Sequence, residues 1–143
     1  MSNVSLKLVM LLALLACAMP HESVRAATPG QDVSVYLQSR FGLTNPQATG
    51  ALGALLVYAR EQLPKPQFDE LASRFPNADI LMELAQQKGV VTRPLDYISD
   101  YEKSLASLNI GQKVASQIAP AVVQYLGDAG YDEEQATLQG ILR

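Results

Sequence analysis

The stretch that decides the fold is residues 44–63, TNPQATGALGALLVYAREQL. Thr44 stands where a helix N-cap is expected, Gln47 follows three residues later as its capping-box partner, and Pro46 suits the first turn. Apolar residues then recur at helical spacing: Ala48, Leu52, Leu55, Leu56, Ala59 and Leu63. The pattern predicts a helix that starts after Thr44, ends before Pro64 and buries a wide apolar face.

Within the same stretch, four of the five residues from 50 to 54 are small: Gly50, Ala51, Gly53 and Ala54. A glycine inside a helix costs about 1 kcal/mol relative to alanine, so two of them need a packing reason. We predict the close approach of another helix backbone. A GxxxG-type membrane dimer is the alternative, but the segment is too short to span a bilayer.

Proline and glycine divide the chain on either side of this stretch into further helical segments. A first helix is predicted from about Gln31 to Phe41, with Gly42 as a left-handed stop. A third, between Pro64 and Pro76, carries apolar residues that include Phe75. A fourth is capped by Asn77, ends at Gly89, and holds the apolar residues Ile80, Leu81, Leu84 and Ala85.

Beyond Gly89, Val90 and Val91 have no partner run to pair with and predict an extended connector. A fifth helix after Pro94 is predicted to carry Leu95, Ile98, Tyr101, Leu105 and Leu108. A sixth spans residues 111–128, buries Val114, Ile118, Val122 and Tyr125, and is kinked near Pro120. A seventh is capped by Asp132 with Gln135 as its capping-box partner, and ends in the apolar residues Ile141 and Leu142.

Together these segments predict an all-α, compact single-domain bundle of about six or seven short helices over residues 27–143. The whole chain has 143 residues, of which 48% are hydrophobic, and a net charge of -3. This composition excludes wholesale disorder, and the weakly acidic balance predicts no nucleic-acid partner.

A short pattern repeats at helix starts. Residues 42–49 (GLTNPQAT) match residues 130–137 (GYDEEQAT), and residues 109–116 (NIGQKVAS) are a looser copy. In each, an apolar residue precedes a cap-like position. Either the three sites share one way of starting a helix, or a helical hairpin has been duplicated. The similar placement of Tyr58 and Tyr125 favours duplication.

Residues 1–26 have the pattern of a secretory signal peptide. Lys7 precedes the apolar run LVMLLALLACAM, and Val24-Arg25-Ala26 predicts cleavage before Ala27. The competing interpretation is a lipoprotein, because Leu14-Leu15-Ala16-Cys17 resembles a lipobox. The chain is therefore expected to be periplasmic or secreted, with membrane attachment only if Cys17 is lipidated.

Cleavage would remove the only cysteine, Cys17, and the only histidine, His21. The remaining chain then has no disulfide, no Ser-His-Asp or Cys-His nucleophile, and none of the usual nitrogen or sulfur ligands for zinc or haem. We therefore predict no catalytic, cofactor-binding or metal-ligating residues, and a protein that is not an enzyme.

After cleavage, carboxylates and tyrosines are the remaining candidates for a functional site. Asp96 and Asp100 are four residues apart and would share a helix face, Asp69-Glu70 is a second acidic pair, and Asp132-Glu133-Glu134 suits a helix start. Each is expected to be a solvated helix face rather than an acid–base pair. We expect four tyrosines to be half-buried core residues: Tyr97 and Tyr101, which are one helical turn apart, and Tyr58 and Tyr125, which have similar places in the repeated pattern. The alternative is that they line a ligand groove or an interface.

Three blocks carry a resemblance to a known family: residues 47–56 (QATGALGALL), residues 68–71 (FDEL) followed by residues 75–79 (FPNAD) and Leu81, and residues 118–126 (IAPAVVQYL). They resemble the VcgC/VcgE family of exported proteins, found mainly in Gram-negative bacteria and of unknown function, although Ala51 stands where that family often has glycine. The resemblance implies an exported location and a helical fold, and it implies no activity.

The expectation for function is a non-catalytic binding or self-association module of the cell envelope. Its partner would be an envelope protein or a second copy. Two alternatives stay open: a carboxylate-dependent enzyme acting on envelope polysaccharide, and a protein that binds an apolar ligand or lipid.

Overall fold

The computed structural model describes residues 32–143; the predicted leader, Cys17 and His21 lie outside this range. The predicted all-α class is confirmed, and within these residues the chain forms helices and no strand. Their bounds are α2 Val33–Phe41, α3 Asn45–Gln62, α4 Lys65–Ala72, α5 Ala78–Gln87, α6 Ile98–Ser104, the 3-10 helix η1 Leu105–Leu108, α7 Gln112–Asp128 and α8 Asp132–Ile141.

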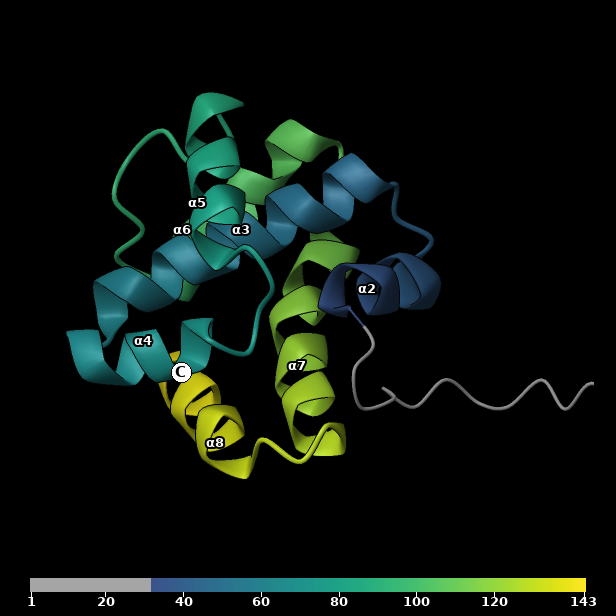
Figure 1. Cartoon of the computed structure of the whole chain (residues 1–143). Coiled ribbons are helices and arrows are strands. Elements are labelled where there is room, and N and C mark those ends of the chain that lie inside the picture. The colour runs from purple at the N-terminus through teal and green to yellow at the C-terminus, as the bar shows by residue number, and fades with distance from the viewer. Residues whose placement is uncertain (1–31) are drawn as a thin grey trace, which may run out of the picture.

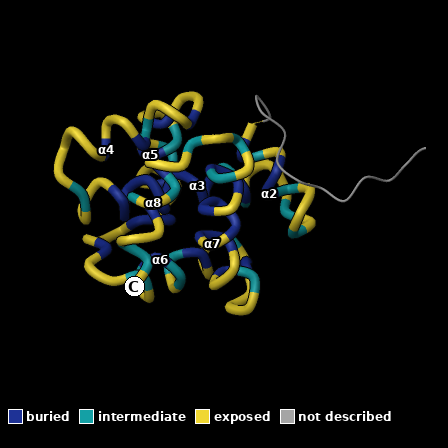
Figure 2. Tube along the Cα trace, turned by 90° about the horizontal axis from the view of Figure 1, so that it is seen from below, coloured by how far each residue is buried: buried dark blue, intermediate teal, exposed yellow. Residues whose placement is uncertain are grey.

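Helix α3 forms the centre of the molecule, and the other helices surround it (Figure 1). Thr44 and Gln47 form the predicted capping box: the Thr44 amide donates to Gln47 Oε1 at 3.0 Å, and the Gln47 amide donates to Thr44 Oγ1 at 3.3 Å. From Gly50 to Ala59 every residue is buried, which Figure 2 shows as a dark core. The helix is therefore enclosed on all sides, beyond the single wide face that the apolar spacing predicts.

The close approach predicted at the small residues is confirmed at Gly53, which faces the backbone of α5. A Cβ placed on Gly53 would lie 2.2 Å from the carbonyl oxygen of Leu81. A Cβ on Gly50 would meet the Leu108 side chain of η1 at 2.8 Å. The small residues of α3 thus serve packing within the domain.

No helix within residues 32–143 is both long enough and apolar enough to cross a membrane.

Helix starts follow the repeated pattern only in part. Gly42, Asn109 and Gly130 all have positive φ and each precedes an apolar residue and a new helix. Asp132, however, is the first residue of α8, not its cap, and no side-chain cap bond forms there, so the predicted Asp132–Gln135 capping box is wrong. The Gln135 side chain lies against Gly127 instead, where the absence of a Cβ leaves room for it.

The predicted cap at α5 is also wrong in its chemistry. Asn77 precedes the helix, but it has a left-handed conformation (φ 59°) and its side chain makes no cap bond. Asn is among the few residues that adopt this conformation readily, so it serves here as a turn residue. Gly89, with φ 71°, lies at the predicted end of the segment.

Several apolar residues lie outside the helices predicted to carry them. Phe75 follows the end of α4 and Leu95 precedes α6, yet both are buried, and Leu105 and Leu108 belong to η1. Ile80 is the opposite case: it lies on α5 as predicted, but it is 55% exposed, while Met82 is buried. Val90 and Val91 lie in the connector between α5 and α6, outside any helix or strand, and both are buried; their extended conformation stays a prediction.

Pro120 lies inside α7, which runs from Gln112 to Asp128. Ile118, Val122 and Tyr125 are buried as predicted, and Val114 is partly buried. The kink near Pro120 stays a prediction.

Candidate functional site

The structure separates the carboxylates that the sequence places together. Asp96 precedes α6, which begins at Ile98, so the prediction that it shares a helix face with Asp100 is wrong. Asp100 Oδ2 accepts the Tyr97 amide hydrogen at 3.1 Å and so satisfies an unpaired donor at the start of the helix. Asp69 forms an exposed ion pair with Lys65 at 2.6 Å, and Glu70 is exposed.

Glu134 is the one buried carboxylate among the described residues, with 8% of its surface exposed. Its Oε1 accepts from Arg74 Nε at 2.6 Å, which links the chain after α4 to α8. The Arg74 guanidinium also lies over the Tyr131 ring, 4.4 Å from the centroid. The described residues hold no cluster of three or more acidic, His or Cys side chains suited to a metal ion.

Of the four tyrosines that the sequence singles out, three are buried and one is exposed. Tyr58, Tyr101 and Tyr125 belong to the core, whereas Tyr97 is 71% exposed, which contradicts its prediction as a half-buried core residue. The Tyr58 and Tyr101 rings lie 6.3 Å apart, and the Tyr58 hydroxyl donates to the Ile141 carbonyl at 2.6 Å. The Tyr101 hydroxyl is buried and has no hydrogen-bond partner within the described part of the chain.

The Tyr101→Phe variant is expected to be more stable than the parent protein by about 1 kcal/mol, because it removes a buried polar group that forms no hydrogen bond. Tyr58→Phe is the matched control and should lose about 1 kcal/mol, since it removes a bond that does form. Urea unfolding of both variants measures the difference. A destabilised Tyr101→Phe protein would mean that an internal water satisfies this hydroxyl.

The buried Tyr101 hydroxyl should also make the stability of the protein depend on pH in alkaline solution. Burial raises the pKa of Tyr101 above its ordinary value, and the charge of Glu102 raises it further. Above pH 10 the unfolded chain therefore releases a proton that the folded chain keeps, and stability falls by about 1.4 kcal/mol per pH unit for this group. Burial also raises the pKa values of Tyr58 and Tyr125, so Tyr101→Phe should lessen this loss without abolishing it.

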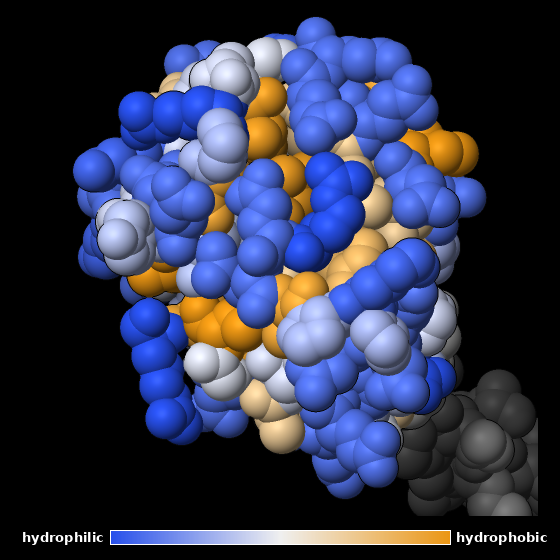
Figure 3. Space-filling model, turned by 90° about the vertical axis from the view of Figure 1, so that its left-hand side faces the viewer, coloured by the Kyte–Doolittle hydropathy of each residue, from blue (hydrophilic) through white to orange (hydrophobic). Residues whose placement is uncertain are grey.

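An open apolar groove lies between α4 and α5, and we call it the α4–α5 groove. It consists of two neighbouring hollows of about 460 and 390 Å³ that share the lining residues Phe68, Asp69 and Asp79. Its floor is made of buried or partly buried apolar residues: Leu63, Phe68, Ala72, Phe75, Ala78 and Met82. Figure 3 shows the α4 side of the molecule, where hydrophobic surface gathers in hollows between hydrophilic ridges.

Charged residues at the rim of the groove are arranged unevenly. The carboxylates Asp69 and Asp79 line both hollows, whereas the cations Arg60 and Lys65 line only the hollow nearer the end of α3. Lys65 is already paired with Asp69, and Asp79 lies in the first turn of α5. The end of the groove at the start of α5 is therefore acidic, and exposed Ile80 stands beside it.

The apolar spacing of the sequence predicts Ile80 as a core residue, and it predicts no role for Arg60 and Asp79. The one sequence signal is the two-proline boundary at Pro64 and Pro66, which separates α3 from α4. The spacing of Ile80 cannot reveal its exposure, because the burial of a helix face depends on which neighbour lies against it.

The fold and the groove define a small all-α protein with a preformed apolar surface hollow. A family model described as "Protein of unknown function VcgC/VcgE (DUF2780)" matches residues 16–143. The chain belongs to this family, and the predicted resemblance is confirmed. No curated protein and no solved structure matches it.

Proposed function

We propose that this protein is an exported, non-catalytic binding module of the cell envelope that holds a segment of a partner protein in the α4–α5 groove. The observation that supports it most is the exposed Ile80 in the lining of a surface hollow that also contains the apolar residues Phe68 and Phe75. The volumes of the two hollows lie within the usual range for ligand pockets, and both hollows are open to the surface.

The proposed occupant is an amphipathic helix that presents large apolar side chains and a basic residue at one end. Apolar side chains fit the floor around Phe68 and Met82, and helix-in-groove binding uses such anchors. The basic residue would meet Asp79 from the larger hollow, which has no cation in its lining. Charge placed in this way gives a partner helix one preferred direction.

Ile80→Asp is expected to weaken partner binding while leaving the fold intact, because the side chain is 55% exposed and lies in the first turn of α5, where negative charge is favourable. Val35→Asp is the matched control, since Val35 is a 49% exposed apolar residue on another helix. Binding should fall at least about tenfold for Ile80→Asp, which corresponds to about 1.4 kcal/mol, and less than twofold for Val35→Asp.

A photo-crosslinking residue at Ser73, which lines the groove and is exposed, should capture the partner in cells, and one at Lys113 on α7 should not. Mass spectrometry of the adduct then identifies the bound segment, and a synthetic peptide of that segment is titrated against the parent protein and both variants. A peptide lacking apolar anchors, an adduct with lipid or with a second copy, or equal labelling at the two positions would each overturn the proposal.

Export is tested separately by the mass of the mature protein. A first residue at Ala27 in periplasmic or secreted material supports the proposal. An acylated Cys17 would place the protein on a membrane, and an intact chain found in the cytosol would refute export.

A further inference from the structure

The connector between α5 and α6 is fixed at both ends, which gives it a defined shape. The amides of Val90 and Val91 both donate to the Ala85 carbonyl, at 2.9 and 3.1 Å. At the other end, the Leu95 amide donates to Glu61 Oε2 at 2.6 Å, and Gln62 Nε2 donates to the Leu95 carbonyl at 3.1 Å. The connector is therefore fixed to α5 at one end and to the end of α3 at the other.

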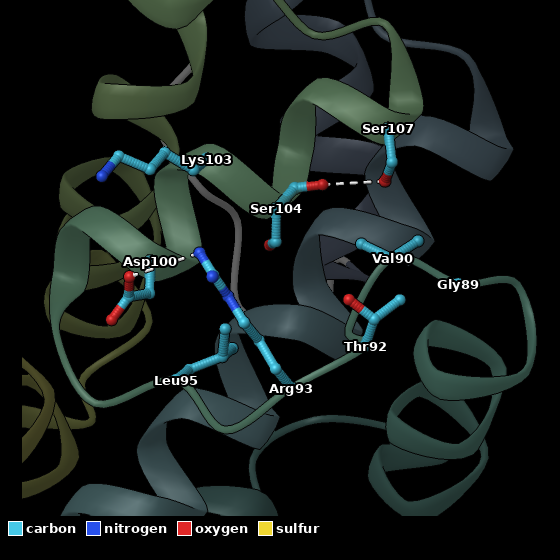
Figure 4. Close-up of a pocket in the computed structure, with 9 residues that line it drawn as sticks. All are labelled: Gly89, Val90, Thr92, Arg93, Leu95, Asp100, Lys103, Ser104 and Ser107. Atoms are coloured by element: carbon cyan, nitrogen blue, oxygen red, sulfur yellow. Dashed lines mark hydrogen bonds and ion pairs between the residues drawn. The ribbon is translucent and has the colours of Figure 1, made fainter.

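Between the connector and α6 lies a hollow of about 240 Å³, which we call the connector hollow. Its polar lining consists of Thr92 and Arg93 from the connector, Asp100, Lys103 and Ser104 from α6, and Ser107 from η1. Figure 4 shows the Arg93 side chain stretched along the hollow toward Asp100, with Thr92 on the opposite side. The hollow is smaller than a typical drug-sized pocket, so it suits a ligand of about monosaccharide size.

Positive charge is in excess around this hollow. Arg93 Nη2 lies 3.8 Å from Asp100 Oδ1, a long contact, and the Arg93 side chain is 68% exposed. The other oxygen of Asp100 accepts the Tyr97 amide hydrogen. Lys103 forms no ion pair within residues 32–143. Arg93 and Lys103 thus both line the hollow beside one carboxylate that is already hydrogen-bonded, and the Lys103 side chain extends away from the hollow (Figure 4). The guanidinium of Arg93 keeps N–H donors for a further anion.

The two serine hydroxyls supply acceptors. Ser104 Oγ donates its hydrogen to the Tyr101 carbonyl at 2.6 Å, and Ser107 Oγ donates to the Ser104 carbonyl at 2.8 Å, the second of which Figure 4 draws. Each hydroxyl has one hydrogen, so what remains at both oxygens is lone pairs. A ligand on this side must therefore bring donors of its own, such as hydroxyl groups.

We propose that the connector hollow binds a small polyhydroxylated anion, of the class of sugar acids and sugar phosphates. The carboxylate or phosphate contacts Arg93, the exposed Lys103 side chain turns toward it on binding, and the ligand hydroxyls donate to Ser104 and Ser107. None of these residues lines the α4–α5 groove, so this site and the proposed function can fail independently.

The test is an NMR titration of the protein with galacturonate, glucose 6-phosphate, glucose and sulfate. Galacturonate, glucose 6-phosphate or both should shift the amides of residues 92–107 in a saturable way. Glucose, which has no charge, and sulfate, which has no hydroxyls, should each bind at least about tenfold more weakly. The stronger of the two anionic sugars identifies the source of the charge.

Arg93→Gln should weaken binding at least tenfold, and Lys103→Gln should weaken it severalfold. The matched control is Lys113→Gln, an exposed lysine on α7 outside the hollow, which should change affinity less than twofold. Because Arg93 is mostly exposed, its variant should unfold within a few degrees of the parent. Equal binding of glucose, equal effects of the Arg93 and Lys113 variants, or no shift in residues 92–107 would overturn the proposal.

Discussion

The Gly53→Ala variant is expected to lose about 3 kcal/mol of unfolding free energy, which corresponds to a fall of about 10–20 °C in Tm. The new Cβ would lie 2.2 Å from the carbonyl oxygen and 2.8 Å from the carbonyl carbon of Leu81. These are backbone atoms of α5 and cannot move aside as a flexible side chain can, so the two helices must separate. The higher helix propensity of alanine offsets only about 1 kcal/mol of this cost.

Two other glycines are the controls, measured by the same thermal and urea unfolding. Gly50→Ala meets only the Leu108 side chain and should cost less, because a side chain can change rotamer. Gly140→Ala in α8 meets nothing within 4 Å and should be neutral or gain about 0.5 kcal/mol. If Gly53→Ala were as stable as Gly140→Ala, the close approach of α5 to α3 would be wrong.

Arg74→Met is expected to destabilise the protein by about 2 kcal/mol, because it leaves the buried Glu134 carboxylate without its cation. This value is below the cost of breaking a fully buried pair, since the Arg74 side chain is 39% exposed and solvent screens its charge. The variant also removes the cation from the face of the Tyr131 ring.

Removing the carboxylate of this ion pair should cost less stability than removing the arginine. Glu134→Leu leaves an arginine that can reach water, and the double variant Arg74→Met/Glu134→Leu should recover most of the stability lost by Arg74→Met. Lys65→Met, at an ion pair whose side chains are 84% and 54% exposed, is the surface control and should change stability by less than about 0.5 kcal/mol. A double-mutant cycle with no coupling would show that Arg74 and Glu134 do not interact.

The residues of α3 show how much the sequence could predict. Its capping box, apolar spacing and small residues depend on neighbours within one or two turns, so local chemistry predicted the start, the end and the close approach correctly. The left-handed stops at Gly42 and Gly89 are local in the same way. The prediction of a helix cap at Asp132 was wrong because a cap depends on the backbone conformation that the preceding turn imposes. That turn makes Thr44 the N-cap of α3 but places Asp132 inside α8.

Neither hollow could be predicted from the sequence. Asp69 and Asp79 line the same groove because α4 and α5 lie side by side. Arg93 and Lys103 line the connector hollow because the connector lies beside α6. Nothing in the local pattern marked Ile80 as exposed or Glu134 as buried.

The sequence by itself determined the all-α class and the order of the helices, because helix propensity, capping and breaking act over a few neighbouring residues. It also determined the family, which is recognised from the residues themselves. The tertiary structure alone decided which faces are covered and which side chains share a hollow. These depend on contacts between residues far apart in the chain, whose geometry is set by how the helices lie against one another.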